Sequence, residues 1–169
     1  GNPNDSHIIT FEPGGVDNNK VQLVGGDTLK SALSYDYEIQ DTLHIKLRAT
    51  DLAGAYYVKS FAILIKDVND APTALALVPD TIREIKPAGT FVGKLVTTDE
   101  DIADTHIYTF VNGVGNADNN QFTISHDSVY SLNQIDYSLQ QKYHIRVRTT
   151  DAGALFFEDT LVIKVIDVN

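Results

Sequence analysis

Apolar and polar residues alternate along much of this chain, in short stretches separated by turn residues. In LHIKLRA, from Leu43 to Ala49, the apolar residues point to one side of an extended strand, and His44, Lys46 and Arg48 to the other. Turn sequences such as Pro-Ala-Gly, Asn-Gly and Asp-Asn-Asn recur about every ten residues, and no segment has helical periodicity. The pattern predicts an antiparallel β-sandwich, with strands in the second half at about 74–84 (broken at Pro79), 91–98, 106–111, 120–124, 128–132, 142–150 and 155–166.

The chain also repeats itself with a period of about 100 residues. Residues 43–69 (LHIKLRATDLAGAYYVKSFAILIKDVN) align without a gap with residues 143–169 (YHIRVRTTDAGALFFEDTLVIKVIDVN). Further upstream, HIITF at His7 matches HIYTF at His106, and two Asp-Asn-Asn sequences also correspond. Chance does not produce such a match, so the chain contains two copies of one unit.

The two copies are not equally complete. The second opens with residues 73–101, which have no counterpart in the first, so we expect a truncated repeat at 1–70 and a complete one at 71–169. Without its N-terminal strands, the first repeat should expose a sheet edge and leave four apolar residues without cover: Ile45, Leu47, Phe61 and Ile63. We therefore predict completion by another molecule, most simply a two-fold homodimer, or by excised strands still bound as a separate chain.

The composition narrows the classes of function. Lys+Arg 13 against Asp+Glu 23 gives a net charge of -10, which argues against nucleic acid and anionic membranes as partners. There are no cysteines, no apolar stretch near the ~20 residues of a membrane span, and no signal peptide. Gly1 has the character of a residue left by processing, which indicates a fragment. His7, His44, His106 and His144 recur with the repeat, which favours architectural roles, and no Ser-His-Asp arrangement or phosphate loop is present, so we do not expect an enzyme.

Acidic residues gather at the predicted strand ends and between the copies. Asp36 and Glu38, like Asp99 and Asp101, are spaced i, i+2 and so face one way in an extended segment. Calcium takes several oxygen ligands from carboxylates, amides and carbonyls, which such clusters supply, whereas zinc would require His or Cys ligands. The alternative interpretation is solvated turn residues, since Asp and Asn are common in turns.

Taken together, the segments YDYE, ATD, DVNDAP, REI and TTDED resemble the cadherin repeat motifs LDRE, AxDxG, DxNDNAP, xEx and DxD, in the same order and with the same period. The residues found at these motifs are most similar to those in cadherin-like repeats of bacterial surface proteins. The resemblance implies two immunoglobulin-like Greek-key β-sandwiches, the first lacking its N-terminal strands. It also implies up to three Ca²⁺ ions between successive domains, with these ligands: Asp36, Glu38, Asp51, Asp67, Asn69, Asp70, the Ala71 carbonyl, Glu84, Asp99, Asp101, Asp136, Asp151, Asp167 and Asn169.

The sequence departs from the family at three ligand positions. Ala71 replaces the usual Asn, but that position offers its carbonyl; Ser138 replaces the acid that corresponds to Glu38; and the first-copy counterpart of Glu84 is missing. We therefore expect the best-preserved ion position to be the one that does not use the missing Glu and is built mainly from Asn69, Asp99, Asp101 and Asp151, plus the Ala71 carbonyl.

The resemblance implies an extracellular, calcium-stiffened adhesion module or spacer of a surface protein, with a homophilic or heterophilic protein partner. An alternative is a carbohydrate-binding or accessory module of a secreted enzyme, acting on a surface glycan. That function would require exposed, coplanar aromatic rings. The adjacent pairs Tyr56–Tyr57 and Phe156–Phe157 lie within predicted strands, so each pair should turn one ring inward, and the chain has no Trp.

Overall fold

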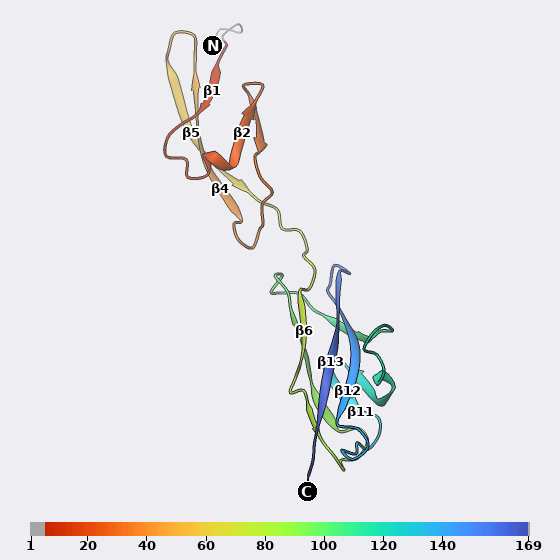
Figure 1. The fold of residues 1–169 in the computed structure, drawn as a ribbon. Helices are drawn as coiled ribbons and strands as arrows, with labels where there is room; N and C mark the ends of the chain where they lie inside the picture. Colours follow the sequence, from red (N-terminus) through yellow and green to blue (C-terminus); the bar gives the residue numbers. More distant parts are fainter. Residues whose placement is uncertain (1–5, 169) are drawn as a thin grey trace. The chain divides into compact units, whose positions relative to one another are not determined.

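The computed structural model describes residues 6–168 of the chain. It forms two compact units, Gly1–Val68 (unit 1) and Asn69–Asn169 (unit 2). Unit 1 runs from red to yellow, and unit 2 from yellow-green to blue, in Figure 1. The regular elements of the described residues are strands and two single turns of 3-10 helix, so the predicted all-β class is confirmed. Among these residues no helix is long and apolar enough to cross a membrane.

Unit 2 is a sandwich of two four-stranded sheets. One sheet has the order β10-β11-β8-β6, and its strands are Phe122–Ser125, Ser128–Ser131, Phe91–Thr98 and Ala74–Val78. The other has the order β7-β13-β12-β9, and its strands are Thr81–Arg83, Phe156–Ile166, Lys142–Thr150 and Ile107–Phe110. A single 3-10 turn, η2 (Asn119–Gln121), leads into β10.

The first strand of unit 2 changes sheets where the sequence predicted a break. Before Pro79 the chain pairs antiparallel with β8 as β6, and after it the chain pairs parallel with β13 as β7. Strand β8 passes very close to this crossing, because a Cβ placed on Gly93 would stand 2.0 Å from the carbonyl oxygen of Pro79. Glycine is therefore required there for the backbones to approach.

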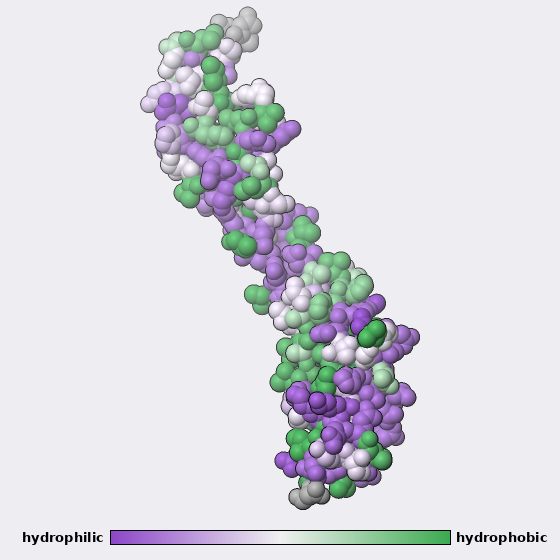
Figure 2. All heavy atoms as spheres, in the orientation of Figure 1, coloured by the Kyte–Doolittle hydropathy of each residue, from purple (hydrophilic) through white to green (hydrophobic). Residues whose placement is uncertain are grey.

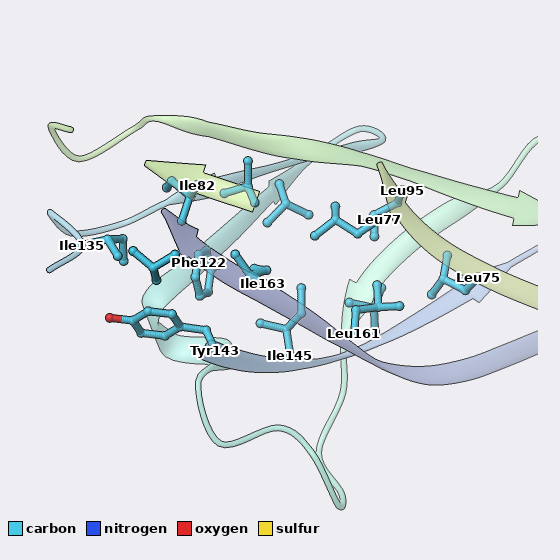
Figure 3. Packing of buried hydrophobic residues seen from close by; sticks show 14 residues of the cluster. Leu75, Leu77, Ile82, Leu95, Phe122, Ile135, Tyr143, Ile145, Leu161 and Ile163 are labelled. Atoms are coloured by element: carbon cyan, nitrogen blue, oxygen red, sulfur yellow. The ribbon is translucent and has the colours of Figure 1, made fainter. Parts of the chain in front are cut away.

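The core of unit 2 lies between its two sheets. Alternate residues of the central strands point inward, and Ile145, Val147 and Ile163 are each 0% exposed. Figure 3 shows these apolar side chains meeting from both sheets. Because an extended strand sends successive side chains to opposite faces, the alternating sequence produces this buried layer directly.

Unit 1 contains the counterparts of the last five strands of unit 2. A three-stranded sheet has the order β1-β4-β5, with strands Ile8–Phe11, Thr42–Thr50 and Tyr56–Leu64. A separate hairpin pairs β2 (Val21–Val24) with β3 (Thr28–Ser31), after the 3-10 turn η1 (Asn18–Lys20). Counterparts of β6, β7 and β8 do not occur among the described residues of unit 1.

The repeated Asp-Asn-Asn sequence has a structural role in both units. In unit 2, the carboxylate of Asp118 accepts a hydrogen bond from the His144 amide at 2.7 Å, and Asn119 Oδ1 accepts one from the Arg146 amide at 2.8 Å. These amides lie along β12 just beyond the end of its pairing with β9. The same contacts recur in unit 1 between the corresponding residues Asp17, Asn18, His44 and Lys46.

The exposure predicted for the truncated repeat is correct in part. Phe61 is 38% exposed, and Leu47 and Ile63 are half-buried. The prediction for Ile45 is wrong: it is 2% exposed, because it packs with Val21 in a small core of its own. The hairpin β2-β3 therefore covers part of the sheet without the missing strands.

Candidate functional site

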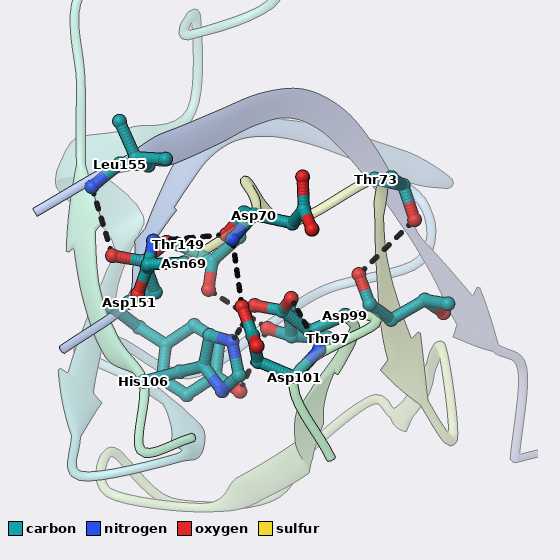
Figure 4. Close-up of polar contacts among 12 residues, drawn as sticks. Asn69, Asp70, Thr73, Thr97, Asp99, Asp101, His106, Thr149, Asp151 and Leu155 are labelled. Carbon is teal, nitrogen blue, oxygen red and sulfur yellow. Dashed lines mark hydrogen bonds and ion pairs between the residues drawn. The ribbon is translucent and has the colours of Figure 1, made fainter. Parts of the chain in front are cut away.

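Acidic residues gather at one end of unit 2, where strands β8 and β12 both finish. Asp99 and Asp101 follow the last residue of β8, and Asp151 follows the last residue of β12. Asn69 and Asp70 precede β6, which is paired with β8, so they reach the same end of the sandwich. Figure 4 shows the side chains of Asn69, Asp99, Asp101 and Asp151 meeting there, with Asp70 joined to them through its backbone amide, and we call these five residues the head cluster.

Hydrogen bonds hold the incoming segment onto this end of unit 2. The amide of Asp70 donates to Asp101 Oδ2 at 2.7 Å, and the side-chain amide of Asn69 donates to Asp151 Oδ2 at 3.0 Å. Asp101 in turn donates its backbone N–H to Asp99 Oδ1 at 3.2 Å. The structure thus brings together the four side chains from which the best-preserved ion position was expected. Ala71 lies exposed just beyond them.

A further carboxylate, which sequence reasoning missed, joins the head cluster. Asp99, Asp104 and Asp151 each offer an oxygen, and these oxygens lie within 4.8 Å of one another. Asp151 is 5% exposed, and the Asp99 side chain 4%. Asp104 Oδ2 is buried without a hydrogen-bond partner. Three carboxylates so placed repel one another in a site with little water, unless a cation neutralises them.

His106 was interpreted as architectural, and its placement links it to this cluster. Its Nε2 lies 2.8 Å from Asp99 Oδ2, and the His106 side chain is 12% exposed. The contact fixes the orientation of the Asp99 carboxylate, as an outer hydrogen-bond partner commonly does for a ligand. The first-copy counterpart, His7, lies at the equivalent position ahead of β1, which the repeat alignment had indicated.

A glycine makes room for Asn69. A Cβ placed on Gly153 would stand 2.4 Å from the Asn69 Cγ and Oδ1 atoms, so no larger residue fits without moving that side chain. Asp151 is held in the same turn, where its Oδ1 accepts the amide of Leu155 at 2.8 Å. The sequence Thr-Asp-Ala-Gly therefore supplies both a carboxylate and the space for the amide beside it.

A second acidic group occupies the opposite end of unit 2, at the far end of β13. That strand has 11 residues, which corresponds to about 35 Å. Glu84 is 9% exposed, and its two carboxylate oxygens accept the amides of Tyr137 at 2.9 Å and Val168 at 3.0 Å. These amides lower the pKa of Glu84. Asp167 also contacts Glu84 here, and Asn169, the last predicted ligand, lies outside the described residues.

Asp136 lies at the same end of unit 2 as Glu84. Its negative charge raises the pKa of Glu84 and so works against the two amides, which lower it. The Ser138 hydroxyl donates to Asp136 Oδ1 at 2.6 Å and lowers the pKa of that carboxyl. Unit 2 thus has Ser138 at the position of Glu38 in unit 1, and the Ser138 hydroxyl is bonded to Asp136. Of the three positions that correspond to Asp36, Glu38 and Asp67, unit 2 therefore has acids at two, Asp136 and Asp167, and Glu84 is the third acid at this end.

The predicted ligands of unit 1 fall at its two ends. Glu38 offers a carboxylate oxygen within 4.8 Å of one from Asp36 and of one from Asp67, beyond the last residue of β5. Asp51 lies at the other end of β4, where its Oδ1 accepts the amides of Ala53 and Ala55 at 2.9 Å each. Asp51 is therefore not part of the group formed by the other three.

Comparison with known proteins points to one family. The profile of the cadherin domain matches residues 80–166. "Protocadherin Fat 2" of Mus musculus is 30% identical over 142 residues, which cover 79% of this chain and 3% of that protein. "Protocadherin Fat 1" of Homo sapiens is 29% identical over 150 residues, which cover 83% of this chain and 3% of that protein.

Solved structures show the same fold. Human protocadherin-24 EC1-2 (form II) has a TM-score of 0.74 at 18% identity, over 99% of this chain and 85% of that one. The protocadherin GammaB4 extracellular domain has a TM-score of 0.68 at 22% identity, over 96% of this chain and 26% of that one. The chain spans only a small part of the curated relatives that it matches, so the similarity concerns its repeats rather than those whole proteins.

Proposed function

Because the chain belongs to the cadherin family, we propose that it consists of extracellular calcium-binding repeats, which serve adhesion or act as a calcium-stiffened spacer in a cell-surface protein. This role is non-enzymatic. It needs a cation site rather than a catalytic group, and an acidic surface is compatible with it. The net charge of -10 favours cations over anionic partners.

The observation that carries the proposal is the head cluster together with Asp104. The donor atoms are all oxygens, from the carboxylates of Asp99, Asp101, Asp104 and Asp151 and from the Asn69 amide. A buried carboxylate oxygen without a partner, as on Asp104, is the kind of group that a bound cation satisfies. Ca²⁺ takes 6–8 such ligands in a flexible shell, so the residues present fit this ion.

Calcium would supply the positive charge that lets these carboxylates remain ionised together. The side chains of the head cluster position the segment that carries Asn69 and Asp70. Asp101 and Asp151 already hold the backbone of Asp70 and the side chain of Asn69, which places the segment ahead of β6 on unit 2. Asn69 now turns its amide nitrogen to Asp151. Its oxygen is the group that a cation would take, and the two differ by a rotation of the amide.

We extend the proposal to the other acidic groups as the family resemblance implies. Asp36, Glu38 and Asp67 in unit 1, and Glu84, Asp136 and Asp167 in unit 2, are placed so that each group presents several carboxylates at one end of its own unit. We expect weaker binding at the second group, because Ser138 contributes a hydroxyl in place of an acid.

Glycan binding, the alternative left open by the sequence, finds little support in the aromatic side chains. Tyr56 and Phe156 are exposed, but guanidinium groups cover them: Arg48 lies 4.4 Å from the Tyr56 ring centroid and Arg148 lies 4.1 Å from that of Phe156. A sugar that stacks on either ring would have to displace its arginine. Tyr57 is exposed as well, contrary to the expectation that one ring of its pair turns inward, but as the next residue of β5 it points to the opposite face from Tyr56. A glycan-array screen of the chain checks this alternative directly.

A calorimetric titration of the whole chain with Ca²⁺ tests the central proposal. We expect binding heat and a rise in the melting temperature of unit 2, since a ligand that binds only the folded state stabilises it by about 2.7 kcal/mol at 100 times its dissociation constant. Asp104→Asn and Asp101→Ala should abolish most of the effect. Asp159→Asn is the matched control, because Asp159 is an exposed acid of β13 outside the head cluster. Absence of heat at millimolar Ca²⁺ would contradict the proposal.

The adhesive and spacer roles are separated by a second measurement. Beads coated with the chain should aggregate in Ca²⁺, and disperse in chelator, if the repeats adhere homophilically. A spacer should instead show only a change of hydrodynamic radius with Ca²⁺ and no aggregation. Mixed beads that carry candidate surface proteins then test for a heterophilic partner.

A further inference from the structure

Unit 1 has a polar pocket on the outward side of its sheet β1-β4-β5, separate from the acidic groups described above. Three segments line it: Gly14 and Gly15 from the loop after β1, His44 and Lys46 from β4, and Ser60 and Ala62 from β5. Its volume of about 390 Å³ lies in the range of ligand pockets, ~300–1,000 Å³. Figure 2 shows hydrophilic and hydrophobic residues mixed over the visible surface of both units, so hydropathy alone marks out no binding site.

The pocket contains a cation that has no acidic partner. None of its lining residues is acidic, and Lys46 Nζ makes no hydrogen bond or ion pair within the described part of the chain. This nitrogen lies beside the loop, 3.9 Å from the position that a Cβ on Gly14 would take. Ser60 stands opposite Lys46 in the pairing of β4 with β5, and its hydroxyl is also without a partner among the described residues. Two hydrogen-bond donors therefore line the pocket without an acceptor from the protein.

In unit 2 the corresponding donors are satisfied by the protein itself. Arg146, which corresponds to the lysine of the pocket, donates from Nη1 to the Val114 carbonyl at 3.2 Å and from Nη2 to Glu158 at 2.9 Å. Thr160, which corresponds to the serine, donates its hydroxyl to the same carbonyl at 3.1 Å. A backbone carbonyl and a carboxylate thus take the hydrogen bonds that no group takes in unit 1.

The loop ahead of the 3-10 turn is the first reason for this difference. It spans residues 12–16 in unit 1 and residues 111–117 in unit 2, so the loop of unit 1 is shorter by two residues. The longer loop lies directly on β13, because a Cβ placed on Gly115 would stand 2.2 Å from the Thr160 hydroxyl oxygen. The shorter loop bonds to the backbone of β4 and makes no hydrogen bond to β5, so the space above β5 stays open.

The second reason is the loss of one acid. Val58 occupies the position of Glu158 and pairs with Arg48 in the same register across the sheet. A valine accepts no hydrogen bond. The acid of the shorter loop, Glu12, forms an ion pair with Arg48 at 2.6 Å. Lys46 is therefore left with a pocket beside it and no carboxylate in it.

We propose that this pocket binds an acidic segment of a partner protein. A glutamate or aspartate carboxylate of that segment would take the Lys46 ammonium, as Glu158 takes Arg146, and a backbone carbonyl would bridge Lys46 and Ser60, as the Val114 carbonyl does in unit 2. Hydrogen bonds between two charged groups are the stronger kind, so the carboxylate should dominate the affinity. Both acceptors of unit 2 are groups of a peptide chain, which favours a peptide over an acidic sugar.

The net charge of -10 does not oppose an acidic partner at this place. Charges more than about 8 Å apart are largely screened at physiological salt, so the groups that line the pocket decide the interaction. The residues of the pocket are also not among those proposed to hold Ca²⁺. Peptide binding should therefore be the same in Ca²⁺ and in chelator, and it can succeed or fail independently of the proposed function.

The first test is an NMR titration of the whole chain with the blocked peptide acetyl-Ala-Glu-Ala-amide. We expect saturable shifts at the backbone amides of Gly14, Gly15 and Lys46, and none in unit 2. The same peptide with Gln in place of Glu is the matched ligand, and should bind about tenfold more weakly or less. Lys46→Gln should weaken binding of the Glu peptide by a similar factor. Lys30→Gln, at an exposed lysine of β3 outside the pocket, should leave binding unchanged.

The second test returns the missing acid to the chain. Val58→Glu places a carboxylate where unit 2 has Glu158, within the register that brings it to Lys46 and Arg48, and should abolish peptide binding although every lining residue is retained. Val58→Gln is the control of equal length without the charge, and should retain most of the binding. Amide shifts of unit 2 in both variants show whether the rest of the chain is unaltered.

Three results would overturn the proposal. The first is an absence of shifts at about 10 mM peptide, a concentration at which even a weak site with a millimolar dissociation constant is largely filled. The second is equal affinity for the Glu and Gln peptides, which would exclude the carboxylate as the recognised group. The third is tighter binding of glucuronate than of the Glu peptide at the same amides, which would assign the pocket to an acidic sugar.

Discussion

The two units share the pairing of five corresponding strands, and their sequences repeat with a period of about 100 residues, yet their cores differ. Unit 2 buries 14 apolar residues in one cluster, whereas the core of unit 1 has three: Val21, Leu43 and Ile45. The difference follows from the three strands β6, β7 and β8, because a sheet can bury its inner face only against a second layer. Strand pairing is thus local and survives in unit 1, while the sandwich core depends on the strands that close it.

The largest expected effect compares one position in the two cores. Ile163→Ala should destabilise unit 2 by about 2–5 kcal/mol, because it removes methyl groups from a fully buried site. The same change at Ile63, which is half-buried, should cost unit 1 about 1 kcal/mol. Denaturant unfolding, followed by amide exchange in each unit separately, measures both. Equal losses would mean that the core of unit 1 is covered in solution.

A second comparison concerns the turn after β12 and its counterpart after β4. Gly153→Ala introduces a Cβ about where Asn69 now lies, and should weaken Ca²⁺ binding roughly tenfold by displacing that side chain. Unit 1 already has Ala53 at this position, so Ala53→Gly is the matched control and should leave Ca²⁺ affinity unchanged. Calorimetric titration checks both. Unaltered affinity in the Gly153 variant would remove Asn69 from the ligand set.

At the next residue of the same turn, Ala154, we expect a smaller effect on stability, with opposite signs in the two units. Ala154 has φ 70°, a left-handed conformation that costs a non-glycine residue strain, and unit 1 has Gly54 there with φ 87°. Ala154→Gly should therefore stabilise unit 2 by about 0.5–1 kcal/mol, and Gly54→Ala should destabilise unit 1 by a similar amount. No heavy atom lies within 4 Å of a Cβ at Gly54, so only backbone strain is tested. Opposite signs in thermal unfolding are the expected result.

The smallest expected effect is on the stability of unit 1, and it appears only at acid pH. The His44 amide, with Gln40 and Lys20, lowers the pKa of Asp17 from 3.8 to about 2. A pKa lowered by folding stabilises the folded state above the unfolded value, so this contribution is complete above about pH 4 and is lost as the pH falls toward 2. Asp17→Asn should flatten the acid unfolding of unit 1 in this window. Asp27→Asn, an exposed acid of the β2–β3 turn, is the control.

Much of the fold could be predicted from the sequence. Periodicity located the strands to within about two residues, and Pro79 marked the point where the first strand of unit 2 leaves one sheet for the other. The exposure of Ile45 and Tyr57 could not be read in the same way. Alternation says which side of a strand a residue occupies, but not whether that side is covered. The hairpin covers Ile45, which is 2% exposed. One ring of the pair Tyr56–Tyr57 was expected to turn inward, yet Tyr57 is 69% exposed and Tyr56 62%.

The head cluster was predictable where its residues belong to a recognisable motif. Asn69, Asp70, Asp99, Asp101 and Asp151 were named from the sequence, and the structure brings them to one end of unit 2. Asp104 was missed because a single acid in a turn has no pattern of its own. Its position three residues after Asp101 was the only signal in the sequence; in the structure the Asp104 amide donates a hydrogen bond to the Asp101 carbonyl at 2.9 Å, which forms the turn. His106 was set aside because it recurs with the repeat, although recurrence does not exclude contact with a ligand.

By itself, the sequence determined the repeat, the strands, the acidic character of the strand ends and the family to which they point, because each of these is carried by local spacing along the chain. Tertiary structure alone decided which acids meet. It placed Glu84, Asp136 and Asp167 about 35 Å of strand away from Asp99 and Asp151, and brought a carboxylate oxygen of Asp104 within 4.8 Å of oxygens from the latter pair. It also decided which apolar residues lack cover, because burial depends on a second sheet layer that no single strand encodes.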